Sequence, residues 1–432
     1  MRIFKDFATA KRVLQGMVAT RTSRRMVSQR LRATDQLPDG SIKIAVYFAD
    51  DAVNMYQMRQ WYAPLAELNK HWPVAIIARS PTSTLQLWDE APVPTLYLRS
   101  VPALEDFVAK QDLHIVFYVN QNAKNFQMFR YGRMWHVFIN HGESDKMYMT
   151  TNQFKAYDYS LVAGDAARDR LARTLWNYDL DSRTMSIGRP QADHFAGPLP
   201  FTPDERTTVL YAPTWEGDRP AAAYGSVATH GVTLVDALLA TGRHRVLYRP
   251  HPRSGVLQPG YARANQAIIA AIARANAADP GAQHIYDNGP TLGWQLASAD
   301  VAITDISAMV YDRLATGRPI IVTRPVNALA EIDSTGYLGD AEWLSAPAVS
   351  DIVAIVDRVQ HSTDALDKLN WWVTRYFGDT TPGSATERFH SAVGSLMDQW
   401  QAEADARPAA EPSGVFSPPV PKAGSGAATE DA

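Results

Sequence analysis

Cysteine is absent from this 432-residue chain. Disulfide bonds and metal sites built on thiolates are therefore excluded. No apolar run approaches the ~18 residues of a membrane-spanning helix, and the N-terminus lacks the uninterrupted apolar segment of a signal peptide. Three motifs are also missing: G-x-G-x-x-G after a strand, G-x-x-x-x-G-K-[ST], and H-E-x-x-H. We therefore expect a cytoplasmic protein with no metal and no dinucleotide cofactor.

The composition is that of a globular protein with more than one core. Hydrophobic residues make up 46% of the chain, which contains 11 Trp, 18 Tyr and 14 Phe. A chain of this length predicts about two or three domains. The formal net charge of −3 does not indicate a nucleic acid partner, and we expect none.

The N-terminal segment is strongly basic. Residues 1–32 hold nine Lys or Arg and a single acid, which gives this segment a charge of +8. Apolar residues between the bases favour an amphipathic arm, residues 1–40, on an anionic membrane surface. A helix packed on the body of the protein, or a frayed tail, fits the pattern equally well. An amphipathic arm on the membrane surface predicts peripheral attachment to the inner face of the cell membrane.

Apolar, β-branched runs alternate with helical stretches from about residue 41 onward. Six runs precede a proline-rich stretch at residues 184–206 and five follow it, which predicts an α/β protein with two parallel sheets covered by helices. We expect two Rossmann-like lobes around a cleft, at residues 41–195 and 196–400. Residues 401–432, rich in Ala, Pro, Gly, Ser and Glu, predict a disordered tail.

Polar clusters follow several predicted strands, and such strand ends share one edge of a parallel sheet, where ligands bind. The first cluster begins with His141 and Gly142. A histidine can take a proton from a hydroxyl at neutral pH, and a glycine lets a substrate approach the backbone. For the histidine taken alone, a loop residue bonded to its neighbours is the alternative interpretation.

Two further clusters follow the first two strand-like runs of the second half. Thr214 and Trp215 end one run and are candidates to line a cleft, although packing is the simpler interpretation of the tryptophan. Arg249, His251 and Arg253 alternate along a segment that two prolines stiffen, so all three can project to the same side. Three cations on one side form an anion clamp, and phosphate is its usual ligand.

The fourth cluster lies where a strand meets the next helix. The strand ends at Thr304 and Asp305, and Ser307 opens the helix. Free backbone N–H groups and the helix dipole favour an anion at such a position. Asp305 or Ser307 could instead serve only as a helix cap.

Together these segments resemble the CDP-glycerol glycerophosphotransferase family, of the teichoic acid polymerase type. The similar motifs, in consistent order, are HG at His141, YAPTW at Tyr211, RPHP at Arg249, TDISAMVYDRLATGRPIIV from Thr304 and GSATERF from Gly383. The resemblance implies a GT-B-like fold, with two Rossmann-like lobes facing a central cleft and the donor nucleotide on the C-terminal lobe. It also implies transfer of glycerol phosphate, or a related polyol phosphate, from a CDP-activated donor to a hydroxyl of a lipid-linked or cell-wall glycopolymer, releasing CMP.

The resemblance also implies roles for single residues. His141 matches the histidine that is thought to act as base, and His251 matches the one implicated in binding the donor phosphates. Asp305 and Ser307 match the donor-side turn. The CDP-polyol is a substrate, so no cofactor is expected.

The loop after the HG motif departs from the family pattern. Family members commonly continue with TPLK, whereas this chain has ESDK. We expect Glu143, Asp145 and Lys146 to form an acceptor loop. Only the lysine is shared with the family pattern, so the motifs do not specify the acceptor, and the oligomeric state is not predicted.

Two other functions fit the same pattern. A GT-B glycosyltransferase that uses a sugar nucleotide has the same two lobes and a similar phosphate site. A catalytically silent nucleotide-binding assembly protein is the other alternative, although the presence of His141 and His251 argues against it.

Overall fold

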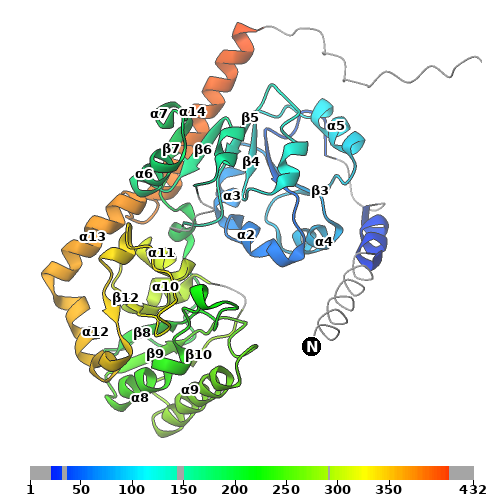
Figure 1. Ribbon diagram of the computed structural model, residues 1–432. Helices are drawn as coiled ribbons and strands as arrows, with labels where there is room; N and C mark the ends of the chain where they lie inside the picture. The colour runs from blue at the N-terminus through cyan, green and yellow to red at the C-terminus, as the bar shows by residue number, and fades with distance from the viewer. Residues whose placement is uncertain (1–20, 32–36, 144–149, 290–291, 408–432) are drawn as a thin grey trace, which may run out of the picture.

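The computed structural model describes residues 21–31, 37–143, 150–289 and 292–407. Two parallel sheets form two lobes, which lie one above the other in Figure 1. The first sheet has seven strands in the order β3-β2-β1-β4-β5-β6-β7. They are β1 (Ile44–Phe48), β2 (Val74–Ala78), β3 (Thr95–Tyr97), β4 (Ile115–Tyr118), β5 (Trp135–Phe138), β6 (Tyr159–Val162) and β7 (Thr184–Ser186).

The second sheet has six strands in the order β10-β9-β8-β11-β12-β13. They are β8 (Thr207–Ala212), β9 (His244–Tyr248), β10 (Ile285–Tyr286), β11 (Val301–Thr304), β12 (Ile320–Thr323) and β13 (Trp343–Leu344). The short β13 pairs with β12 and was not expected from the sequence. The other five strands coincide with the apolar runs of the second half of the chain.

The central strands form because their residues are apolar on both faces. All five residues of β1 are buried, and Val46 lies in register between Ile76 of β2 and Phe117 of β4. Each sheet runs outward from its first strand, β1 or β8, and then returns to build the other half from β4 or β11. Ligands of such sheets bind outside the carboxyl ends of the strands at this reversal point. The arrangement is the α/β, two-lobed GT-B fold.

Helices cover the faces of both sheets. Those of the first lobe are α2 (Met55–Arg59), α3 (Tyr62–Leu68), α4 (Pro81–Glu90), α5 (Val101–Lys110), α6 (Asp165–Thr174) and α7 (Leu180–Arg183). Those that follow β8 are α8 (Val232–Ala240), α9 (Pro259–Ala278), α10 (Trp294–Ser298), α11 (Ala308–Leu314), α12 (Ile352–His361), α13 (Thr363–Phe377) and α14 (Ser384–Ala406). The helical stretch between β1 and β2 is divided into two short helices, α2 and α3.

The last helix returns to the first lobe. In Figure 1, α14 rises from the second lobe and runs beside β6 and β7. Phe389, Val393 and Leu396 are fully buried in the core formed with Ile44, Val46 and other side chains of the first sheet. Residues 384–400 were expected to belong to the second lobe, but their apolar face completes the core of the first. The helix also continues to Ala406, into the segment expected to be disordered.

Residues 21–31 are helical and lie against the first lobe. Val27 is fully buried, and Arg30 reaches α4, where its Nη1 lies 2.7 Å from Asp89 Oδ1 and its guanidinium lies 5.3 Å from the Trp88 ring centroid. This part of the basic arm is therefore packed on the body, which was one of the alternatives. The remaining part of the arm, residues 1–20, lies outside the described residues.

Candidate active site

The His141 turn, residues 140–143, follows β5 at the carboxyl edge of the first sheet. Asn140 has a φ of 55°, a left-handed conformation that asparagine tolerates better than most residues. Its side-chain amide donates a hydrogen bond to the Gly142 carbonyl, and the Trp61 indole N–H donates to the Asn140 carbonyl. These bonds fix the backbone on both sides of His141.

The His141 ring is held by a backbone carbonyl at the end of the neighbouring strand β4. Its Nδ1 lies 2.8 Å from the Val119 oxygen. A carbonyl oxygen can only accept, so Nδ1 carries the proton and the lone pair of the neutral ring is on Nε2. The exposed Tyr56 ring lies edge-on, with ring centroids 5.8 Å apart. The half-buried imidazole is thus oriented as a proton acceptor at Nε2.

Glu143, the first residue expected in the acceptor loop, is buried inside the first lobe. Its carboxylate is buried and forms an ion pair with Arg170 of α6, which is also buried. A carboxylate in this position neutralises the arginine inside the lobe. Asp145 and Lys146, the other two predicted members of the loop, lie outside the described residues.

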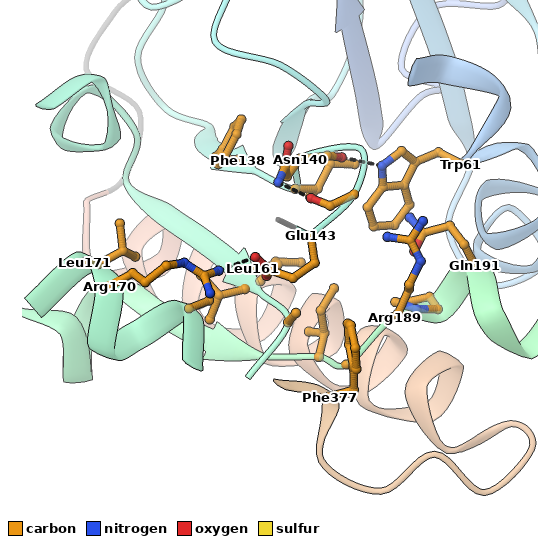
Figure 2. Close-up of a pocket in the computed structure, with 18 of the residues that line it drawn as sticks. Trp61, Phe138, Asn140, Glu143, Leu161, Arg170, Leu171, Arg189, Gln191 and Phe377 are labelled. Atoms are coloured by element: carbon orange, nitrogen blue, oxygen red, sulfur yellow. Dashed lines mark hydrogen bonds and ion pairs between the residues drawn. The ribbon is translucent and has the colours of Figure 1, made fainter. Parts of the chain in front are cut away.

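A cavity of about 50 Å³ lies beside the His141 turn, and Figure 2 shows the residues that line it. Trp61, Asn140 and Glu143 lie on its walls, together with Arg189, whose guanidinium lies near the indole. Among the residues that the structure describes, a Cβ on Gly142 would meet only Arg189, at 3.5 Å from Nη1, an ordinary contact distance. The fold itself would therefore tolerate alanine here, so close approach of a substrate remains a reason for the glycine.

In the second lobe, Arg249 does not join the predicted clamp. Strand β9 ends at Tyr248 and the chain then turns, so the alternation assumed for residues 249, 251 and 253 does not continue. The Arg249 guanidinium forms an ion pair with Asp287, beyond the end of β10, and donates to the Gly289 carbonyl at 3.1 Å. Arg249 therefore joins two strand ends, and its charge is already balanced.

His251 is half-buried in this turn. Its Nδ1 lies 3.1 Å from the backbone N–H of Arg253, which can only donate. Nδ1 is therefore an acceptor, and the proton of the neutral ring is on Nε2. Burial lowers the pKa of His251, and the charge of Arg253 lowers it further, against the opposing effect of Glu216. At neutral pH the ring is thus a neutral hydrogen-bond donor at Nε2.

Arg253 and Trp215 are brought together by the same turn. The exposed guanidinium lies 3.7 Å from the centroid of the Trp215 ring, a cation–π contact. Glu216, which the sequence reasoning did not select, fixes the backbone beyond it. Its buried carboxylate accepts from the N–H groups of Gly255 at 2.9 Å and Leu257 at 2.7 Å. Burial opposes ionisation of Glu216, but these backbone donors outweigh it and its pKa is lowered.

Asp305 lies beneath the carboxyl edge of the second sheet. The carboxylate is fully buried and accepts from the backbone N–H groups of Thr214 at 2.8 Å and Ser226 at 3.0 Å and from the Thr323 hydroxyl. Burial raises the pKa of Asp305 to about 6, although these hydrogen bonds act against the rise. This placement favours a positioning role over direct contact with a ligand.

Thr304 and Ser307 flank Asp305 and differ in their exposure. The Thr304 hydroxyl is buried and finds no hydrogen-bond partner among the described residues. Ser307 is half-buried and caps the seven-residue helix α11, because its Oγ accepts from the Met309 N–H at 3.3 Å. The capping role that the sequence left open is therefore present. Ser307 can contact a ligand, whereas Thr304 is covered.

The second sheet thus brings Thr214, Trp215, His251 and Arg253 together around the ends of β8 and β9, above the Asp305 carboxylate. No three His, Asp or Glu side chains in the described ranges are grouped so that they could hold a metal ion. Neutral and cationic donors, with the helix start at Ser307, are the groups available to an anion here.

Two residues near the site were missed from the sequence. Tyr56 lies on α2, far from the HG motif in the chain, and no local pattern marks it. Arg189 stood in a segment interpreted as a boundary. Its side chain is buried and forms an ion pair with Asp312 of α11, at the second lobe. Strand β7 (Thr184–Ser186), which precedes it, lies in the same segment and was not expected either, so the sequence offered no signal for this arginine.

Comparison with known proteins identifies the family of the chain. A family model described as CDP-Glycerol:Poly(glycerophosphate) glycerophosphotransferase matches residues 134–389, which is more than half of the chain. No curated protein matches the chain. None of the helices in the described ranges has the length and hydropathy needed to cross a membrane.

Several solved structures share the fold. A structure of the wall teichoic acid polymerase TagF has a TM-score of 0.54 and 14% identity, covering 91% of this chain and 99% of its own. Another TagF structure, soaked with CDPG, has a TM-score of 0.52 and 13% identity, covering 84% and 90%. A putative UDP-N-acetylglucosamine 2-epimerase from Listeria monocytogenes has a TM-score of 0.54 and 12% identity, covering 83% and 97%.

Proposed function

The chain belongs to the CDP-glycerol:poly(glycerophosphate) glycerophosphotransferase family, and we propose that it transfers glycerol phosphate from CDP-glycerol to a hydroxyl of a lipid-linked or cell-wall glycopolymer. CMP is the second product. One structural neighbour is a wall teichoic acid polymerase, which supports a teichoic acid as the class of acceptor. A related CDP-polyol remains an alternative donor, because the site residues point to the phosphates and not to the polyol.

The proposed reaction is a single displacement at phosphorus. The acceptor hydroxyl attacks the phosphorus that carries glycerol, and the new O–P bond forms as the bond to the bridging oxygen breaks. CMP leaves with that electron pair, while Nε2 of His141 takes the proton of the hydroxyl. Charge that develops on the leaving phosphate would be stabilised by donors on the second lobe.

The observation that carries this proposal is the opposite arrangement of two histidines. The Val119 carbonyl gives His141 a lone pair on Nε2, as a base requires. The Arg253 N–H gives His251 a proton on Nε2, as a ligand of phosphate oxygen requires. Arg253 and the start of α11 at Ser307 are the further donors proposed for the phosphates.

Arg249, Thr304 and Asp305 support the donor site indirectly in this proposal. Arg249 joins the ends of β9 and β10 through Asp287, and Asp305 holds the segment at Thr214. Thr304 is the last residue of β11, next to Asp305, and is buried. Their substitution should weaken donor binding by displacing the turns that carry His251 and Trp215.

A donor screen tests the proposed reaction. Purified protein is incubated with CDP-glycerol, CDP-ribitol or UDP-sugars and a membrane extract as the acceptor source, and the release of CMP or UDP is measured. We expect CMP release from CDP-glycerol that depends on the acceptor. Release of UDP instead would indicate a sugar-nucleotide glycosyltransferase, and binding of the nucleotide without turnover would indicate a silent assembly protein.

We also propose that the basic N-terminal arm attaches the enzyme to an anionic membrane surface, where a lipid-linked acceptor would be found. Arg21, Arg24 and Arg25 are exposed on the described part of the arm. Each such charge near an anionic leaflet is worth about 1 kcal/mol. The attachment would be peripheral, on the cytoplasmic face, and screened by salt.

Vesicle sedimentation tests the attachment. The triple substitution Arg21→Gln, Arg24→Gln and Arg25→Gln should weaken binding to phosphatidylserine vesicles by about 10- to 100-fold, without changing CMP release with a soluble acceptor. Val27 and Arg30, which pack on the lobe, are not substituted, so the helix keeps its contacts with the lobe. Equal binding by the variant and the natural chain would contradict the proposal for these residues.

A further inference from the structure

Arg189 lies between the His141 turn and the second lobe. It follows β7, and 5% of its side chain is exposed. Its Nη2 forms an ion pair with Asp312, whose side chain is 7% exposed, and also donates to Gln60 Oε1 at 3.3 Å. Its Nη1 lies 3.5 Å from the position that a Cβ on Gly142 would occupy. One side chain therefore lies beside the residue next to His141 and forms an ion pair with a residue of the other lobe.

Asp312 belongs to α11, the helix that Ser307 caps. The ion pair thus joins the turn that carries the proposed base to the helix that begins at the proposed donor site. Burial raises the pKa of Asp312, although the arginine opposes the rise. Asp312 balances the charge of Arg189, whereas Glu143 of the His141 turn is paired with Arg170.

Stability alone does not explain this arrangement. Burying an ion pair costs desolvation that its mutual attraction often fails to repay, and apolar pairs of similar size are frequently as stable. The Nε–H of Arg189 is in addition buried with no hydrogen-bond partner among the described residues, which also costs free energy. A role in positioning the reacting groups explains why a buried arginine that adds little stability is present here.

We propose that Arg189 is a positioning residue, which sets the place of the His141 turn relative to α11 so that the acceptor hydroxyl and the donor phosphates meet in line. This inference rests on the proposed function, and it adds a residue that the HG and RPHP motifs do not contain. Arg189 acts through Gly142 and Asp312 and takes no part in the chemical step.

A second ion pair between the lobes provides the matched control. Arg375 of α13 pairs with Asp169 of α6, and their side chains are 38% and 43% exposed. This pair also joins the first lobe to a helix that follows the second sheet, but through α6 and α13 instead of the His141 turn and α11. Loss of lobe contact in general should therefore affect both pairs, whereas loss of positioning should affect only Arg189.

Steady-state kinetics and donor calorimetry test the proposal. In Arg189→Met we expect kcat with CDP-glycerol to fall by about 10- to 100-fold, since small displacements of positioned groups have effects of this size. The Kd for CDP-glycerol should stay within about threefold. Arg189→Lys, which keeps the charge, should recover part of the loss, and Arg375→Met should stay within about threefold in both quantities. Equal losses in Arg189→Met and Arg375→Met, or a donor affinity that falls as much as kcat, would overturn the proposal.

A spectroscopic measurement separates this proposal from the proposed function. The histidine-ring ¹⁵N signals are recorded without substrate, with His141 assigned through His141→Asn. Arg189→Met should shift the His141 signals and Arg375→Met should not; unchanged signals in Arg189→Met would overturn the coupling, whatever the activity of the natural chain. If Arg189→Met does not fold, Asp312→Asn, which keeps the shape and removes one charge, is measured in its place with the same expected shift.

Discussion

His141 and His251 each stand just beyond a strand of a parallel sheet, one in each lobe, yet their rings are held in opposite ways. Nδ1 of His141 donates to the carbonyl of Val119. Nδ1 of His251 accepts from the N–H of Arg253. The neutral rings therefore present a lone pair in one lobe and an N–H in the other.

The difference teaches that a backbone group can assign the role of a histidine. The partner of His141 is 22 residues away and comes from the neighbouring strand, whereas the partner of His251 is two residues away within the same turn. The first ring is thus fixed by the sheet and the second by local chain geometry. Substitutions that imitate one ring nitrogen at a time can test whether the two rings have different tasks.

The largest effect is expected from His141→Asn. The asparagine amide can still donate to Val119, because it occupies the position of Nδ1, but no group remains at Nε2. We expect kcat to fall by about 10² to 10⁴-fold, the usual contribution of general acid–base catalysis, with donor affinity nearly unchanged. CMP release with an acceptor and donor calorimetry measure the two quantities. Turnover at the natural rate would remove His141 from the mechanism.

The next effect concerns the buried carboxylate beneath the donor site. Asp305→Ala would leave the N–H groups of Thr214 and Ser226 buried without a partner, at a cost of about 2 to 6 kcal/mol in the free energy of unfolding. Asp305→Asn keeps an acceptor for both, and its amide can donate to the Thr323 hydroxyl. We therefore expect chemical denaturation to show a large loss for alanine and a small one for asparagine.

The same pair of variants has a pH signature. Because the pKa of Asp305 is raised to about 6 in the folded protein from its ordinary 3.8, the carboxyl group contributes stability that is complete below the lower value and is lost as the pH rises through the higher one. Asp305→Asn should therefore gain stability relative to the natural chain between about pH 4 and pH 7. A constant difference over that range would mean that the aspartate titrates normally.

The sequence sufficed for the fold because the strands are continuous apolar runs. Runs such as residues 44–48 are buried on both faces, and that pattern requires a sheet covered by helices. The short β13 was missed since two residues carry no periodicity. The return of α14 to the first lobe was missed because an amphipathic pattern does not show which core the apolar face of the helix will join.

The site was predictable only where one segment contains the whole feature. His251 and Arg253 lie in one turn, and their neighbourhood follows from the chain itself. Arg249 was assigned to a clamp because its partner Asp287 is 38 residues away, on a strand end that only the sheet order brings near. The burial of Glu143 was not predicted, because its partner Arg170 is 27 residues away, on α6.

A smaller effect is expected at His251, where the comparison predicts the reverse of His141. In His251→Asn the side-chain oxygen can still accept from the Arg253 N–H, but the donor at Nε2 is lost. Since a hydrogen bond to a charged group is worth about 1.5 to 3 kcal/mol, the Kd for CDP-glycerol or CMP should rise by about 10- to 100-fold. His251→Gln, which keeps an N–H near the Nε2 position, should lose less. Equal affinities for all three proteins would place the donor phosphates elsewhere.

The smallest effect is expected from the stacked pair beside His251. Trp215 holds the exposed Arg253 guanidinium 3.7 Å from its ring centroid, and a cation–π contact at an exposed site is worth about 0.5 to 1 kcal/mol. Trp215→Leu keeps an apolar surface and removes the π face, so Arg253 keeps its charge but loses its fixed position. We expect the Kd for CDP-glycerol to rise by about two- to fivefold, and Arg253→Met, which removes the charge as well, to have the larger effect of the two. The contribution of Arg253 should fall with added salt because the group is exposed, whereas that of the half-buried, neutral His251 should not. Calorimetry of Trp215→Leu, Arg253→Met and His251→Asn at low and high salt measures the difference. If Arg253→Met keeps the natural affinity at low salt, His251 is the phosphate ligand of this turn, and Arg253 only packs on the Trp215 ring.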